Sequence, residues 1–157
     1  MGEAKVVELI NGPGTVGLVL VDSTYAPASP EMVEEVLANI MAKKPIGATP
    51  TVEAAESLEI TIAATVTVQG ISLDEVKREL ETGLTEYLKT LIETKYGRIY
   101  YGPDEDLPYT LVYNRVLAIL LNIKGVENFS ALTVNGGEKD ISIPADSIPV
   151  LGEVVVT

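Results

Sequence analysis

The chain contains no histidine, no cysteine and no tryptophan among its 157 residues. Without His and Cys it cannot form a Ser-His-Asp triad, a thiolate nucleophile, an imidazole acid or base, or an ordinary zinc site. Catalysis would have to use carboxylates, lysine or tyrosine. The absence of cysteine also excludes disulfides, which suits a reducing cytosol, a virion and an exported protein equally well, so it indicates no compartment.

Basic residues are scarce, because 11 Lys and Arg stand against 23 Asp and Glu, which gives a formal net charge of −12. Such a chain repels phosphates unless it has a strong basic patch, and the densest basic group, residues 77–98, is interleaved with acids. The longest apolar run, Val116–Leu121, is far shorter than the roughly 20 residues of a membrane span. The N-terminus has no basic region followed by an apolar stretch. We therefore expect a soluble protein that binds neither nucleic acid nor a membrane.

What is present is enough apolar sequence for a folded core, since 46% of the residues are hydrophobic. The first part of the chain predicts a β-α-β-β order. Ser29 and Pro30 suit the N-cap and first residue of a helix, and apolar pairs every four residues extend it to about Ala42. The strands predicted around this helix are Thr15–Asp22, Thr49–Ala55 and the strictly alternating Leu58–Gln69.

The rest of the chain predicts an α-α-β-β-β order. Ser72 and Glu75 form a capping box, and apolar residues at steps of three and four carry the helix to about Thr94. Asn135-Gly136-Gly137 tolerates the positive φ values of a tight hairpin turn. The elements expected after the long helix are a loop at 97–107 with a short strand Arg98–Tyr101, a helix Tyr109–Asn122, and strands Val126–Val134, Lys139–Ile143 and Gly152–Thr157.

These patterns together predict an α+β protein of two small lobes, in which three main helices pack on mixed or antiparallel sheets. We expect a β-α-β-β lobe at 1–70 and an α-α-β-β-β lobe at 71–157, with a soft boundary near Gly70.

No segment describes an active site. Gly12-Pro13-Gly14-Thr15 has the glycines of a phosphate loop, but it lacks the Lys-Ser/Thr ending and precedes a strand, so we interpret it as a turn. The acidic Asp104-Glu105-Asp106 is not followed by the loop of a calcium site, and we interpret it as a solvated loop. We expect no metal and no cofactor.

Two groups of side chains are candidates for contact with other molecules. Tyrosines around the acidic loop can pack in an interface or stack on a sugar or base. The apolar C-terminal strand is either paired inside a sheet or open at its edge to another chain. The residues that we predict to form a subunit interface are Tyr100, Tyr101, Tyr109, Val150, Leu151, Val154 and Val156.

Motifs with a recognisable order run along nearly the whole chain. In the first part they are Gly14-Thr15-Val16, Ala26-Pro27-Ala28-Ser29-Pro30-Glu31, Lys44-Pro45-Ile46-Gly47-Ala48 and Thr51-Val52-Glu53-Ala54. In the last part they are Gly125-Val126-Glu127-Asn128, Leu132-Thr133-Val134-Asn135-Gly136-Gly137, Asp140-Ile141-Ser142-Ile143-Pro144 and Ile148-Pro149-Val150-Leu151-Gly152. Their order and spacing resemble the C-terminal half of the baseplate J-like proteins, in the form found in PBSX-like prophages.

The resemblance implies a structural role without catalytic residues, as a wedge component of the baseplate in contractile phage tails and related injection machines. It implies other baseplate and tail proteins as partners, together with further copies of the protein in a ring. It implies a place in the virion after assembly in the host bacterial cytoplasm. Members of this family are normally at least twice as long, so it also implies that the chain is a fragment of a longer protein.

Two other functions stay open on the residues alone. A carbohydrate- or peptide-binding module would use the tyrosine-rich loop, and substitution of Tyr101 would then abolish binding without unfolding the protein. A carboxylate-based hydrolase would show a bell-shaped pH profile. The 23 acids make some suitably spaced pair inevitable, so a carboxylate pair in the sequence has no predictive value.

Overall fold

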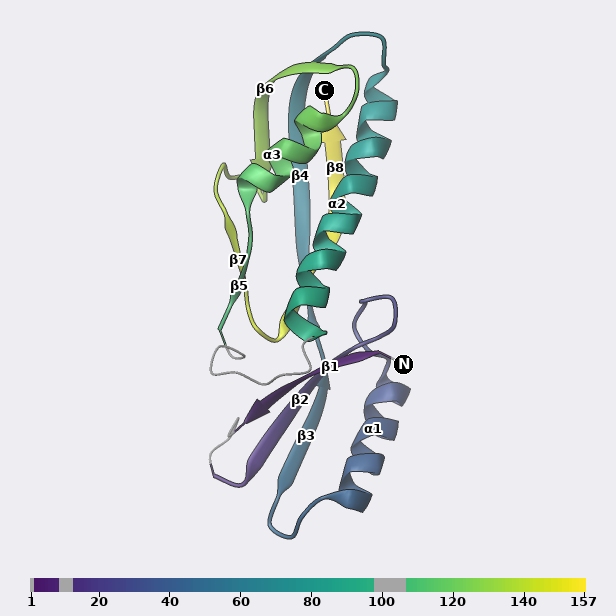
Figure 1. Ribbon diagram of the computed structural model, residues 1–157, viewed down its shortest axis with the longest axis vertical. Coiled ribbons are helices and arrows are strands. Elements are labelled where there is room, and N and C mark those ends of the chain that lie inside the picture. Colours follow the sequence, from purple (N-terminus) through teal and green to yellow (C-terminus); the bar gives the residue numbers. More distant parts are fainter. Residues whose placement is uncertain (1, 9–12, 98–106) are drawn as a thin grey trace. The chain divides into compact units, whose positions relative to one another are not determined.

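The computed structural model describes residues 2–8, 13–97 and 107–157 (Figure 1). Over these residues it has three helices and eight strands, which confirms the predicted α+β class with mixed and antiparallel sheets. Contacts divide the chain into two compact units. Unit 1 comprises Met1–Ser57, Ile92–Pro108 and Pro144–Ile148, and unit 2 comprises Leu58–Leu91, Tyr109–Ile143 and Pro149–Thr157. The partition into lobes 1–70 and 71–157 stays a prediction.

Unit 1 is built on a three-stranded sheet of β1 (Glu3–Glu8), β2 (Thr15–Val21) and β3 (Thr49–Ala54), in the order β1-β2-β3. β1 is antiparallel to β2, whereas β3 is parallel to it. A parallel pair needs a crossover, and α1 (Pro30–Lys43) supplies it. The helix begins as predicted, because the Ser29 hydroxyl accepts a hydrogen bond from Met32 N at 3.3 Å.

The side chains of β2 point alternately to the two faces of the sheet and pack into two separate hydrophobic cores of unit 1. Leu20 packs with Val52 and the apolar stripe of α1 on one face of the sheet. Val19 and Val21 point to the other face, where they pack with three residues from distant parts of the sequence, Ile92, Tyr96 and Ile148. The hydroxyl of Tyr96 donates to Ala145 O at 3.3 Å, and burial raises the pKa of Tyr96 above its usual range.

Unit 2 contains a second three-stranded sheet, in the order β6-β4-β8. Its strands are β4 (Glu56–Val68), β6 (Val126–Val134) and β8 (Ser147–Val156), and α2 (Leu73–Tyr96) and α3 (Tyr113–Asn122) pack against it (Figure 1). The inward residues of β4 are Ile60, Ile62 and Ala64, as the alternation predicts. The buried stripe of α2, from Val76 to Leu88, has a spacing of four residues and covers them. The predicted capping box forms, with Ser72 N donating to Glu75 Oε2 at 3.0 Å.

Two expected boundaries are wrong. The helix predicted from Tyr109 begins at Tyr113, because Tyr109–Leu111 instead forms a strand, β5, that pairs antiparallel with β7 (Ile141–Ile143). The tight turn predicted at Asn135-Gly136-Gly137 forms, because Val134 N donates to Gly137 O at 2.8 Å and Gly137 N donates to Val134 O at 3.0 Å. The strand that follows this turn, β7, pairs with β5 and does not extend the pairing with β6. The last strand begins at Ser147 and not at Gly152. It includes Pro149, which a strand at the edge of a sheet can accommodate.

Candidate functional site

The C-terminal strand β8 is paired along one side and lies at the edge of its sheet among the described residues. Thr157 N donates to Ala64 O at 2.9 Å, and Val66 N donates to Thr157 O at 2.9 Å. Earlier in the strand Gly152 approaches Glu59, so both strands advance in the same direction and the pair is parallel. One side of β8 therefore pairs inside the sheet, as the first alternative predicts, and no strand of the described residues pairs with its other side. Contact of that side with another chain stays a prediction.

The side chains of β8 divide between the core and the surface. Val154 is 2% exposed and belongs to the core of unit 2, with Leu151 and Val156 packed against that core. Val150 is 38% exposed and Val155 is 41% exposed. The exposed apolar side chains of β8 are therefore these two valines, whereas the side chain of Val154 packs inside the unit.

A glycine in the middle of β8 allows a close approach to β4. A side chain at Gly152 would overlap the carboxylate end of Glu59, so the strand keeps its position beside β4 only with a residue that lacks Cβ, or after Glu59 moves. Glu59 on β4 and Glu153 on β8 are both exposed.

The described tyrosines have structural partners. Tyr109 is half-buried in β5, opposite Ile143. The Tyr113 hydroxyl donates to Leu132 O at 2.9 Å, and burial raises the pKa of this phenol above its usual value. Tyr100, Tyr101 and the cluster Asp104-Glu105-Asp106 lie outside the described residues. The predicted interface role of Tyr100, Tyr101 and Tyr109 stays a prediction.

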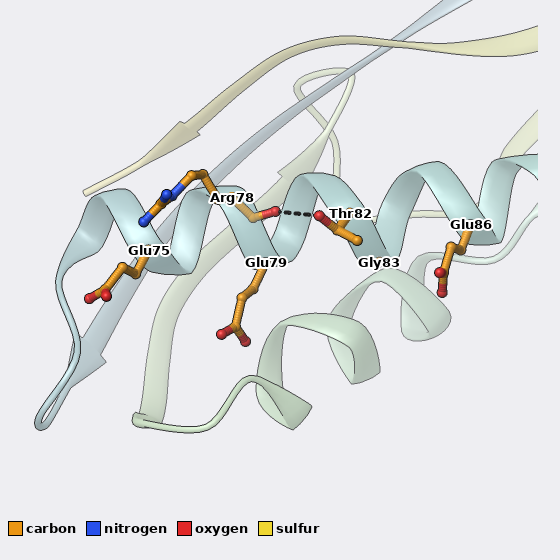
Figure 2. A pocket seen from close by; sticks show the side chains of 6 residues that line it. All are labelled: Glu75, Arg78, Glu79, Thr82, Gly83 and Glu86. Atoms are coloured by element: carbon orange, nitrogen blue, oxygen red, sulfur yellow. Dashed lines mark hydrogen bonds between the residues drawn. The ribbon is translucent and has the colours of Figure 1, made fainter.

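A groove on the outer flank of α2 in unit 2 carries several carboxylates (Figure 2). It is lined by Glu75, Arg78, Glu79, Thr82, Gly83 and Glu86. At Gly83 the helix lies so close to α3 that a Cβ would be 2.7 Å from Ile119 Cγ2. Thr82 donates to Arg78 O at 2.9 Å, and Ser72 lowers the pKa of Glu75 through hydrogen bonds from its backbone N–H and its hydroxyl. These contacts are those of a capped, solvated helix.

No group of three or more acids with metal-binding geometry occurs within residues 2–8, 13–97 and 107–157. The Gly14 turn has a positive φ of 82°, and Gly14 O accepts from Thr49 N at 2.8 Å, which supports its interpretation as a turn into β2. No helix in the described parts of the chain is long and apolar enough to cross a membrane.

Sequence reasoning missed one surface, a pocket in unit 1 at the C-terminal end of α1. It lies between that helix, β2 and the loop into β3. The loop that contributes Pro45 and Ala48 to this pocket also contains an exposed apolar residue, Ile46, which is the nearest signal in the sequence.

The chain has an α+β fold in which β8 is an edge strand among the described residues and carries exposed valines. Residues 60–157 match the baseplate J-like protein C-terminal domain, and residues 1–54 match the baseplate J-like central domain. The chain belongs to the baseplate J-like protein family. This confirms the resemblance seen in the ordered motifs, and membership of this family indicates a structural role.

Individual relatives agree with this assignment. The phage-like element PBSX protein XkdT of Bacillus subtilis (strain 168) is 31% identical over 165 residues, covering 99% of this chain and 43% of the relative. The uncharacterized protein YqbT of the same organism is 30% identical over 163 residues, covering 98% of this chain and 43% of the relative. The chain thus spans less than half the length of these two relatives.

The fold is also similar to that of a solved structure. A chain in the cryo-EM structure of the anti-feeding prophage (AFP) baseplate, 6-fold symmetrised, matches with a TM-score of 0.56 and 13% sequence identity. The match covers 92% of this chain and 31% of that chain. At this level of identity the similarity concerns the fold.

Proposed function

We propose that the protein is a structural component of the baseplate of a contractile phage or prophage tail, acting through contacts with other proteins and without catalysis. The observation that carries this proposal is the match to two consecutive baseplate J-like domains, central and C-terminal, over residues 1–54 and 60–157. The fold similarity to a chain of a baseplate supports it.

The partners in this proposal are other baseplate and tail proteins, with further copies of the protein in a ring. Its place is the virion tail, after assembly in the cytoplasm of the host bacterium. The acidic surface suits such a role, because a net charge of −12 keeps unassembled subunits apart and steers them towards basic surfaces.

The outer edge of β8 is the contact surface that the structure favours. The backbone N–H and C=O of Thr157 both bond to β4. Successive residues of a strand direct these groups to opposite sides, so those of Val154 and Val156 face away from β4. A strand from a neighbouring subunit could pair with these groups and cover the exposed Val155.

The test is mass spectrometry of tail particles purified after prophage induction. We expect peptides of this chain to cosediment with sheath and tube proteins at a constant ratio of a few copies per tail. Complete contractile tails that lack the protein would contradict the proposal. A strain in which the gene is deleted provides the control, and we expect it to yield no complete tails.

A further inference from the structure

The C-terminal end of α1 forms a concave apolar surface in unit 1, which we call the α1 pocket. The apolar residues that line it are Val16, Leu18, Ile40, Pro45, Ala48 and Pro50. They come from β2, from α1, and from the loop and first residues that lead into β3. The loop is held in place because Lys44 Nζ donates to Ala48 O at 2.7 Å, and Gly47 adopts a positive φ of 91°.

Apolar side chains around the α1 pocket are unusually exposed. Ile46 is fully exposed on the loop, and Met41 is half-exposed on the last turn of α1. No residue of α1 is fully buried, so its apolar stripe is only partly covered by the sheet. Exposed apolar side chains are stabilised when another protein removes them from water.

The charge at the rim of the α1 pocket is opposite to that of the chain as a whole. Lys43 and Lys44 line the rim, and none of the described residues that line the pocket is acidic. The C-terminal end of a helix contributes about −0.5 of a charge, which two lysines outweigh. The pocket is therefore locally positive on a chain whose formal net charge is −12. Its complement is apolar and negatively charged.

We propose that the α1 pocket binds an acidic, apolar segment of another protein, with an aliphatic or aromatic side chain in the pocket and carboxylates against Lys43 and Lys44. If the proposed function holds, that segment belongs to a neighbour in the baseplate, and to that extent the inference rests on it. An anionic membrane fits less well, because two lysines attract it weakly and the many other acids of the chain repel it.

The test uses the isolated protein labelled with 15N and two synthetic peptides. The peptides share the same apolar residues and differ only in their charged residues, all Glu in one and all Lys in the other. We expect the Glu peptide to shift the amide resonances of Ile46, Ala48 and Val16, and to bind at least about tenfold more tightly than the Lys peptide.

Substitutions test the two parts of the site separately. Ile46→Ala removes the exposed apolar side chain and Lys43→Glu reverses the charge of the rim, and each is expected to weaken binding of the Glu peptide about tenfold or more. Both side chains are exposed, so the amide spectrum should otherwise remain that of the folded protein. Lys124→Glu is the matched control, because it makes the same charge change at an exposed lysine in unit 2, and it should leave affinity unchanged.

Four outcomes would overturn the inference. The two peptides could bind equally, or not bind at all at millimolar concentration. The resonance shifts could be confined to α2 or β8, or the protein could bind vesicles of anionic lipid without binding the Glu peptide. The result is independent of the tail-particle experiment. If the protein binds the peptide but is missing from complete tails, only the proposed function is refuted. If it is present in tails but does not bind the peptide, only the proposal for the α1 pocket is refuted.

Discussion

Asn135 continues the pairing of β6 with β4 by using its side chain as well as its backbone. Its backbone N donates to Thr61 O at 2.9 Å, and its Oδ1 accepts from Thr61 N at 2.7 Å. Its Nδ2 also donates to Glu59 O at 3.1 Å. Asn135 has a positive φ of 49°, a conformation that asparagine tolerates better than most residues. One residue thus ends the strand, starts the turn and satisfies three backbone groups of β4.

We expect Asn135→Ala to lower the free energy of unfolding by about 1–3 kcal/mol, through lost hydrogen bonds and the cost of a positive φ. The measurement is urea denaturation. Asn135→Gly separates the two causes, because it keeps the backbone conformation and removes only the side-chain bonds, so it should cost less than Asn135→Ala. Equal stability of Asn135→Ala and the original protein would contradict this role.

Comparing alanine substitutions at two glycines separates the cost of backbone strain from the cost of a steric collision. Gly125 has a φ of 99°, and a Cβ there would lie 2.6 Å from Ile71 Cγ2 and 3.0 Å from Gln69 O. Gly136 has a φ of 73°, and a Cβ there would meet nothing within 4 Å. We expect Gly136→Ala to cost about 1–2 kcal/mol, and Gly125→Ala to cost clearly more because the collision adds to the strain. Thermal unfolding of the two variants checks the order.

The buried and exposed valines of β8 should respond differently to truncation. We expect Val154→Ala to lower the free energy of unfolding by about 1.5–3 kcal/mol, because this side chain is buried in the core of unit 2. Val150→Ala should change it by less than about 0.5 kcal/mol, because Val150 is largely exposed. Deletion of 154–157 should unfold unit 2. A deletion variant that unfolds like the full chain would show that the strand is dispensable to the core.

The Asp22 turn predicts a pH dependence of stability. Hydrogen bonds from the Thr24 hydroxyl and from backbone N–H groups hold the pKa of Asp22 below its usual value. A carboxyl whose pKa is lowered in the folded state stabilises the fold above the unfolded pKa of about 4, and this contribution is lost as the pH falls through the folded pKa.

The experiment compares Asp22→Asn with the original protein by urea denaturation from pH 7 to pH 2. The variant should be less stable at pH 7, and the difference should shrink as the pH falls below about 4. Thr24→Ala removes the hydroxyl that lowers the pKa of Asp22 most. In the Thr24→Ala background, the stability contribution of Asp22 should therefore be lost at a higher pH. A constant difference at every pH would contradict the assignment.

Most elements were predictable because their signals are local. The N-cap at Ser29, the capping box at Ser72 and the alternation in β4 all depend on neighbours a few residues away. β1 gave no such signal, because Lys5 occupies a buried position in it, with an exposed fraction of 2%. Its ammonium group donates to Ala145 O at 3.4 Å, a partner 140 residues away that no local pattern reveals.

The burial of the residues predicted to form an interface was only partly predictable for the same reason. Val150, Val154 and Val156 have the same apolar character in the sequence, and only the pairing with β4 decides which of them is buried. β5 was missed because three strand residues precede a helix with an apolar pattern that extends back over them. The α1 pocket was not predictable, because it forms only where β2 and the end of α1 come together in the folded chain.

Unit 1 combines residues from both matched domains, and this limits how baseplate J-like proteins can exchange domains by recombination. The match to the central domain ends at residue 54, yet the face of its sheet formed by Val19 and Val21 is covered by Ile92, Tyr96 and Ile148, which lie within the range matched by the C-terminal domain. A recombination event at the boundary between the two matched domains would pair this face with foreign side chains. Viable hybrids should therefore keep complementary residues at all of these positions, and the two domains should evolve as one inherited block.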